Sequence, residues 1–505
     1  MKKVLLTILT GSLLLTIAAC SKKQPPIPDE VILARIGDRI ITKNDFIQRA
    51  EYTIRPPYCK SDLYLHKKIV LNSLIAEKLL AFEAGDTNKL VQNERFKAFI
   101  TGRSEQTMRQ LFFKDKIMSK VNLDQDEVKQ MYNLAGRTYK IGFISIQDSA
   151  ATEFVRKALF EQGMGFEELV KKYADSDSVA QHEISWQNEQ NPVMRDLFYG
   201  QKLTKGQILG PVKVGDENLF LKVLGWTDKL AISPDDIKNR SDDVTEHLTR
   251  KQGDRYYQDY VVDLMKGKKL EFNKDTFFKL IDIMGEYYFA SQQQNPNMFD
   301  ARPLNNRETL LDSLGDSIEE IRDMPLLSLS GEVWTVDDLE KQLMRHPLQF
   351  RKKKFRRVEF GEQLKYAIAD LIADKYITEE AYEKGYDKNP IVQNVRDTWQ
   401  DSYAAIYQRN KILKKAGKFD TFDKEYMRTI EGVLDPEVDS LQKKYSDAIA
   451  VNFDLFEDIK LTRIDLFVVY ENQPYPIATP SFPVITTDNM LDYGSKIEIP
   501  GLKKK

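Results

Sequence analysis

The stretch Leu74-Ile75-Ala76-Glu77-Lys78 recurs almost unchanged far downstream, as Leu371-Ile372-Ala373-Asp374-Lys375. Around both copies, apolar residues return at helical spacing, so each copy predicts an amphipathic helix with one buried face. The apolar positions are Leu71, Leu74, Ile75, Leu79 and Phe82 in the first helix and Leu364, Ile368, Leu371 and Ile372 in the second. A repeated helix of this kind indicates that the chain contains one module twice.

A strand-like segment precedes each of these helices in the same order and at nearly the same spacing. Val31-Ile32-Leu33-Ala34-Arg35-Ile36-Gly37-Asp38 predicts a strand that enters a turn, and Thr42 follows as a helix cap. Leu326-Leu327-Ser328-Leu329-Ser330-Gly331-Glu332, followed by Thr335, repeats this order. Any two amphipathic helices can share a short run of residues, but the matched order of strand, turn, cap and helix favours a duplication.

Later segments of the two modules also correspond. A basic turn and a short strand are predicted at 265–272 and again at 441–451. Between the modules, Ser291-Gln292-Gln293-Gln294-Asn295-Pro296-Asn297 predicts an exposed linker. After residue 470, prolines among aromatic and polar residues exclude regular structure and predict an extended arm or a surface strap.

Composition limits the class of protein. The 505 residues are 42% hydrophobic and 30% charged with a formal net charge of −2, which fits two or three folded domains and gives no reason to expect nucleic acid. The 4 histidines are far apart in the sequence, and none forms a ligand-spaced pair. The sequence also lacks a phosphate-binding glycine loop, a nucleophile elbow and an HExxH motif. We therefore predict no metal and no cofactor.

The N-terminus has the pattern of an export signal. Two lysines precede an apolar run from Val4 to Ala19, which is too short for a comfortable membrane span. Its ending, Ile17-Ala18-Ala19-Cys20, resembles the bacterial lipobox, which implies that Cys20 is lipidated and anchors the mature chain to a membrane. Ser21 resembles the residue that follows the cysteine in lipoproteins of the outer membrane. The expected location is the periplasm; the alternative is an ordinary cleaved signal.

The order of these motifs resembles the SurA/PrsA/PpiD group of exported periplasmic foldases. In that group a strand, a Gly-Asp turn, a threonine cap and a helix precede a Leu-Ile-rich helix. Here the pattern is carried by Ile36-Gly37-Asp38, Thr42, Phe46 and the helix from Leu74 to Leu80. The resemblance implies a helical chaperone module in which the N- and C-terminal pieces of each copy pack together.

Within the first module, a stretch from about Thr138 to Trp226 resembles a parvulin-type prolyl isomerase domain. It opens with the strand Tyr139-Lys140-Ile141-Gly142-Phe143-Ile144-Ser145-Ile146, and Gly163-Met164-Gly165-Phe166-Glu167-Glu168-Leu169 matches the family's Gly-x-x-Phe-x-x-Leu. Gly206-Gln207-Ile208-Leu209-Gly210-Pro211-Val212 matches the turn before the last strand. The resemblance implies an α/β domain inserted in the first module.

The expected fold class is α+β and mainly helical, with a duplicated module and this inserted domain. The expected parts are a signal peptide (1–20), a tether (21–30), a helical module (31–137), a parvulin-like domain (138–228), the returning helix and strand of the first module (229–285), a linker (286–320), a second module (321–470) and a Pro-rich arm (471–505).

The resemblance also assigns a site, but its chemistry is incomplete. The two histidines that the family carries fall on Phe143 and Leu219, so the resemblance assigns no catalytic residue. Asp175 stands at the family's cysteine/aspartate position, and Met194 and Phe198 match the spacing of the proline pocket. These residues also have ordinary explanations, since Asp175 suits a helix-ending turn and a Met/Phe pair one helical turn apart suits a core. The expected peptide-binding residues are Phe143, Met194, Phe198 and Leu219.

The resemblance therefore implies a lipid-anchored envelope chaperone that holds unfolded exported or outer-membrane polypeptides, with a non-catalytic parvulin-like domain. One alternative is an active peptidyl-prolyl cis-trans isomerase. The other is a dedicated accessory subunit of an envelope or secretion assembly. The expected partners are unfolded exported polypeptides and, through Cys20, a membrane. A fixed partner in an envelope complex belongs to the last alternative.

Overall fold

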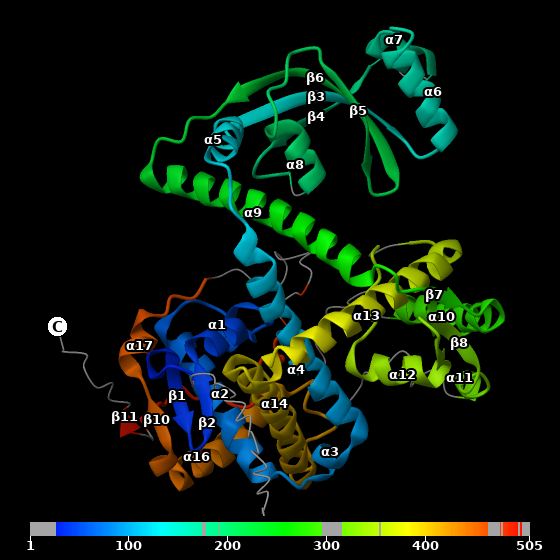
Figure 1. The fold of residues 1–505 in the computed structure, drawn as a ribbon. Helices are drawn as coiled ribbons and strands as arrows, with labels where there is room; N and C mark the ends of the chain where they lie inside the picture. The colour runs from blue at the N-terminus through cyan, green and yellow to red at the C-terminus, as the bar shows by residue number, and fades with distance from the viewer. Residues whose placement is uncertain are drawn as a thin grey trace, which may run out of the picture. The chain divides into compact units, whose positions relative to one another are not determined.

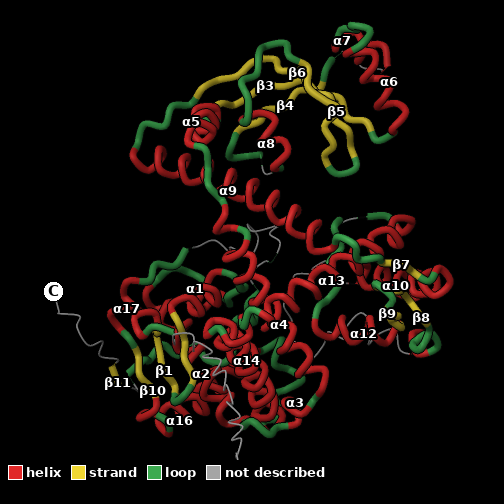
Figure 2. Tube along the Cα trace, in the orientation of Figure 1, coloured by secondary structure: helices red, strands yellow, loops and turns green. Residues whose placement is uncertain are grey.

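The computed structural model describes residues 27–173, 178–189, 191–294, 316–352, 355–462, 475, 478–492 and 495–496. The fold is α+β and mainly helical, which confirms the expected fold class at this level (Figure 1; Figure 2). The chain forms two compact units, which we describe separately. The first unit is Met1–Phe112 with Met265–Lys505, and the second is Phe113–Leu264. Cys20, Asp175 and residues 295–315 of the predicted linker lie outside the described residues.

The first sheet of the first unit has the strand order β11-β10-β1-β2. Its strands are β1 (Ile32–Ile36), β2 (Arg39–Thr42), β10 (Ile449–Val451) and β11 (Ser495–Lys496). β1 is antiparallel to β2 and to β10, whereas β11 runs parallel to β10. The tight turn from β1 to β2 requires a φ of 59° at Gly37, a left-handed conformation that glycine adopts without strain.

Helices cover this sheet and supply most of its core. The hydroxyl of Thr42 accepts a hydrogen bond from Asp45 N at 3.0 Å, and the Asp45 carboxylate accepts one from Thr42 N at 2.8 Å, so α1 begins with a capping box. The helices of this part are α1 (Lys43–Glu51), α2 (Tyr64–Ala84), α3 (Lys89–Gln92), α4 (Glu94–Lys116), α14 (Pro390–Lys415), α15 (Tyr426–Thr429), α16 (Asp435–Lys444) and α17 (Phe453–Asp458). α2 packs along α14, and the core includes Leu33, Phe46, Leu74 and Phe456.

A second, smaller sheet of the first unit has the strand order β7-β8-β9 and its own core. Thr335 and Asp338 form the same capping box at the start of α12 that Thr42 and Asp45 form at α1. The elements are β7 (Leu270–Phe272), β8 (Pro325–Leu329), β9 (Glu332–Thr335), α10 (Lys274–Gln294), α11 (Asp316–Glu319), α12 (Val336–Arg345) and α13 (Phe360–Glu383). The core includes Leu326, Trp334 and Phe360.

The pairing of the short strands differs from the expected one. We expected the strands near 270 and 450 to return to their own modules. Instead β7 pairs with β8, and β10 pairs with β1, so each sheet is completed by a strand that the sequence assigned to the other module. Asn273 alone separates β7 from α10, and Leu280 and Met284 of α10 are buried in the second core, which holds β7 beside β8.

The second unit is built around a four-stranded antiparallel sheet with the order β4-β3-β6-β5. Its strands are β3 (Arg137–Ile146), β4 (Ala180–Ser185), β5 (Ile208–Val214) and β6 (Glu217–Asp228), and its helices are α5 (Gln125–Leu134), α6 (Ser149–Phe160), α7 (Phe166–Tyr173), α8 (Pro192–Tyr199) and α9 (Pro234–Met265). α6 and α7 lie on one side of this sheet, and α8 and α9 lie on the other (Figure 1).

Alternating side chains give this sheet two separate cores. On β3, Tyr139 and Ile141 belong to the core on the α8 side, whereas Ile144 and Ile146 pack on the α6–α7 side. The short elements of the two units are 3-10 turns and one π turn among the described residues. The 3-10 turns are Asp29–Val31, Pro57–Cys59, Met118–Lys120, Arg357–Glu359, Tyr386–Lys388 and Ser446–Ala448, and the π turn is Ile430–Leu434. Among the described residues, no helix is both long enough and apolar enough to span a membrane.

Candidate functional site

Helix α8 places two of the expected site residues. The Asn191 side chain caps the helix by accepting hydrogen bonds from Val193 N at 2.9 Å and Met194 N at 3.3 Å, and Pro192 occupies the first turn. Met194 and Phe198 then lie one turn apart on the inner face. Their exposed fractions are 5% and 0%, so neither side chain reaches solvent in this structure.

Phe143 on β3 and Leu219 on β6 lie on the same face of the sheet as α8. Leu219 is paired with Ser145 and Val212, and Phe143 is paired with Leu221. Both Phe143 and Leu219 are half-buried, and they pack against the core that contains Met194 and Phe198. The structure therefore gathers all four expected peptide-binding residues, but two of them lie beneath the surface.

Two valines extend the accessible part of this cluster. Val212 lies opposite Leu219, and Val214 follows on the same face of β5. Both are half-buried and pack on the same core. We call Phe143, Val212, Val214 and Leu219 the apolar patch. Its surface can bury apolar side chains of a ligand.

A polar cluster that sequence reasoning missed fastens α8 to α9 on this side of the sheet. His247 Nε2 lies 2.9 Å from Asp196 Oδ1, and Lys251 Nζ lies 3.2 Å from Asp196 Oδ2. Burial alone would raise the pKa of Asp196, but the hydrogen bond from His247 and the charge of Lys251 lower it. The His247 ring also packs edge-on against Trp186, so this cluster fixes the position of Met194 and Phe198.

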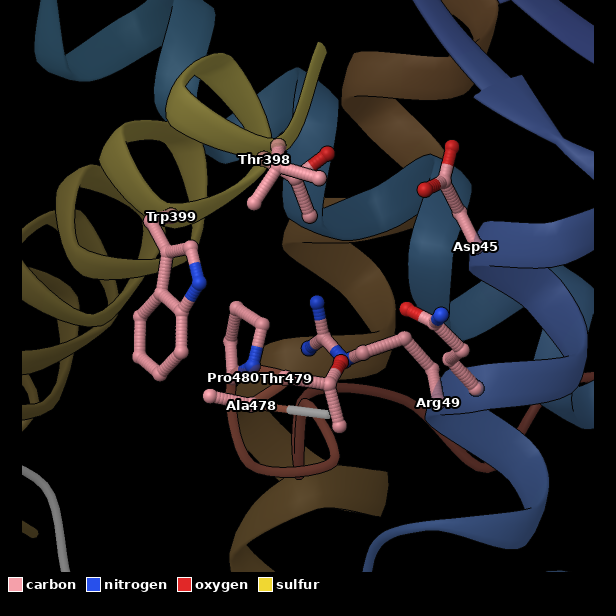
Figure 3. Close-up of a pocket in the computed structure, with 9 residues that line it drawn as sticks. Asp45, Arg49, Thr398, Trp399, Ala478, Thr479 and Pro480 are labelled. Atoms are coloured by element: carbon pink, nitrogen blue, oxygen red, sulfur yellow. The ribbon is translucent and has the colours of Figure 1, made fainter. Parts of the chain in front are cut away.

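The first unit contains a small recess, between α1, α14 and residues 478–480 (Figure 3). Arg49 is 1% exposed and donates two hydrogen bonds to the Glu77 carboxylate, at 3.0 and 2.7 Å, and one to Ser481 O at 2.7 Å. Its Nε and the Thr398 hydroxyl, both buried at this recess, have no hydrogen-bond partner among the described residues. The recess thus offers a donor and a hydroxyl to a further acceptor.

A second buried network joins α4 to α12 and α13. Glu105 accepts hydrogen bonds from His346 Nε2 at 2.6 Å and from the Tyr382 hydroxyl at 3.1 Å, and Arg109 NH2 lies 3.4 Å from His346 Nδ1. Burial lowers the pKa of His346 more than the hydrogen bond to Glu105 raises it. The neutral imidazole therefore donates from Nε2 and accepts at Nδ1, and the network positions helices.

No protein-family model matches this chain, and no curated protein or solved structure resembles it at a significant level. Within the described ranges, no cluster of three or more His, Cys, Asp or Glu side chains has the arrangement of a metal site. The candidate sites are therefore the apolar patch of the second unit and the recess of the first unit.

Proposed function

We propose that this chain is a lipid-anchored chaperone of the bacterial envelope that holds unfolded exported polypeptides. The observation that carries the proposal is the apolar patch. Phe143 and Leu219 occupy the places where the parvulin family carries proton-bearing histidines, and both side chains are half-buried beside the α8 core. A site built this way can bury a client's apolar side chains.

The order of elements in the second unit supports a parvulin-like domain. A strand, two helices, a strand, a helix and two strands follow one another from β3 to β6, in the order of the family's motifs. The family needs a polar network around the twisting amide, because the barrier to rotation is about 18–20 kcal/mol. A benzyl and an isobutyl group supply no such network, which favours holding over isomerisation.

The two capped hairpins of the first unit support a duplicated chaperone module. In each, a short antiparallel hairpin leads through a threonine–aspartate capping box into a helix. We propose that the duplication enlarges the surface available to clients. Lipidation of Cys20 would hold this surface at the outer membrane, where exported polypeptides arrive unfolded.

Binding of this kind is expected to be weak and reversible. Each Val, Leu or Phe side chain that a client buries fully contributes about 1.5–3 kcal/mol. Ordering an extended client offsets much of this gain. Release then follows from fast dissociation or from folding of the client, with no further energy source.

A binding assay with the full mature chain, begun at residue 21 so that it is not lipidated, tests the proposal. The client is a urea-unfolded, fluorescently labelled outer-membrane β-barrel protein, diluted into the chaperone. We expect Phe143→Ser to weaken binding about fivefold or more, because it removes the largest side chain of the apolar patch. The matched control is Phe160→Ser, since Phe160 is 46% exposed on α6, across the sheet.

Circular dichroism first checks that both proteins are folded. If the wild type and Phe143→Ser then bind the client with equal affinity, the role of the apolar patch is contradicted. The same proteins also decide the isomerase alternative. They are tested for acceleration of X-Pro isomerisation in a short peptide. If the wild type accelerates it and Phe143→Ser does not, an active isomerase is favoured instead.

A further inference from the structure

The C-terminal arm, which we define as residues 478–492, lies across the first unit without helix or strand. Side chains from three helices donate hydrogen bonds to its backbone carbonyls. Arg49 of α1 donates to Ser481 O at 2.7 Å, Arg409 of α14 donates to Val484 O at 3.5 Å, and Asn72 of α2 donates to Asp488 O at 2.9 Å. Every polypeptide offers such carbonyls, so these three contacts do not depend on the arm's sequence.

The arm also inserts apolar side chains into the core under these helices. Phe482, Ile485 and Leu491 are 5%, 2% and 5% exposed and belong to the core of the first sheet. The prolines predicted an irregular segment here, and the segment is irregular, but much of it is buried and it is not a surface strap. The arm thus occupies a groove with an apolar floor.

The composition of the arm defines what the groove accepts. The run Phe482-Pro483-Val484-Ile485-Thr486-Thr487 is rich in the aromatic and β-branched residues that favour strands. The Asp435 carboxylate accepts hydrogen bonds from both threonine hydroxyls, at 2.5 and 2.7 Å. Beyond the arm, β11 pairs in parallel with β10, so the segment ends by adding a strand to a sheet. The bound segment therefore has the character of an unpaired β-strand.

The groove's polar lining is only partly used by the arm. At the recess beside Pro480, the Nε of Arg49 and the hydroxyl of Thr398 have no hydrogen-bond partner among the described residues. Figure 3 shows Arg49 and Thr398 near Ala478, Thr479 and Pro480. Leaving a buried donor unpaired costs free energy. A ligand with a carbonyl oxygen at this point would satisfy groups that the arm leaves unsatisfied.

We propose that this groove is a binding site for extended polypeptide segments rich in aromatic, β-branched and hydroxyl side chains, and that the arm is its internal ligand. This inference rests on the proposed chaperone function and names the class of client. A client must displace the arm, so its apparent affinity is reduced by the fraction of molecules in which the groove is occupied.

Two substitutions with opposite expected effects test the inference in the full mature chain. Phe482→Ser weakens the arm without altering the groove, so we expect it to tighten binding of a labelled peptide with the sequence of residues 478–492 at least fivefold. Asn72→Asp keeps the shape of the side chain and the oxygen that accepts from Gln442, but it removes the amide donor to Asp488 O. In the Phe482→Ser background, we expect it to weaken peptide binding about threefold or more, measured by fluorescence anisotropy.

If Asn72 makes no contact with the bound peptide, Asn72→Asp leaves peptide binding unchanged, and that result overturns the inference. Equal peptide affinity of the wild type and Phe482→Ser also overturns it, as does loss of the folded first unit in Phe482→Ser, because the arm is then an integral part of the core. A dimer of the wild type in light scattering that Phe482→Ser dissociates would assign the groove to the arm of a second copy and overturn the inference as well. The patch variant Phe143→Ser tests the chaperone function separately.

Discussion

Glu77 and Asp374 occupy the same place in the two copies of the repeated stretch, and each lies against an arginine and a part of the C-terminal region. Arg49 links Glu77 to Ser481 O, whereas Asp374 accepts a hydrogen bond from the Tyr475 hydroxyl at 2.9 Å and lies 3.7 Å from Arg109. Burial is the main cause that raises the pKa of Asp374. The repeated acidic position therefore anchors residues from the end of the chain in both copies.

His346 gives the first unit a predicted dependence on pH. Glu105, Arg109, Arg345 and Asp374 surround it, and its burial lowers its pKa below the ordinary value of 6.5. The unfolded chain binds a proton below about pH 6.5, whereas the folded chain resists it. The stability that neutral His346 contributes is therefore present above that pH and is lost as the pH falls toward the lowered pKa.

The substitution His346→Gln tests this point, because the glutamine amide can still donate to Glu105 but does not titrate. We expect the wild type to lose more unfolding free energy than His346→Gln between pH 7.5 and pH 5.5. Urea titrations followed by tryptophan fluorescence measure the difference. Equal losses in the two proteins would mean that His346 does not sense pH in the folded chain.

At the scale of elements, α4 and α12 approach each other unusually closely. A Cβ on Gly102 of α4 would lie 2.0 Å from the carbonyl oxygen of Arg345, the last residue of α12. This contact allows Glu105, one turn further along α4, to reach His346. The buried network and the glycine therefore form one packing arrangement.

We expect Gly102→Ala to lower the free energy of unfolding of the first unit by about 1–3 kcal/mol, because the methyl group forces the two helices apart. Urea unfolding of the wild type and of Gly102→Ala measures this difference in free energy. The control is Gly432→Ala in the π turn, where a Cβ meets nothing within 4 Å. Alanine is the better helix former by about 1 kcal/mol, so the control should be neutral or stabilising. An unchanged Gly102→Ala protein would contradict the close packing.

Elements with a strong local pattern were predictable from the sequence, and their partners were not. The helices that contain Leu74 and Leu371 follow from the spacing of their apolar residues, and the helix starts after Thr42 and Thr335 follow from those capping threonines. β7 has three residues, Leu270–Phe272, and so short a strand does not specify which sheet it joins. The pair of His247 and Asp196 is 51 residues apart in the sequence, with no motif to connect them.

At the scale of the whole chain, the two halves of the first unit depend on each other. β10, at 449–451, completes the sheet of β1, at 32–36, whereas β7, β8 and β9 all come from the stretch between residues 270 and 335. The second unit likewise takes all four strands of its sheet from one continuous stretch. This arrangement fits an insertion in a duplicated module, which remains a proposal.

Photo-crosslinking in intact cells tests the central proposal most directly. The probe replaces Val214 in the apolar patch, since Met194, one of the peptide-binding residues expected from the sequence, is buried. A matched probe replaces Phe160 on the opposite side of the sheet. A chaperone predicts a ladder of many different exported proteins at Val214 and far fewer adducts at Phe160. A single discrete adduct at Val214 would contradict the account and assign the chain to one fixed envelope assembly.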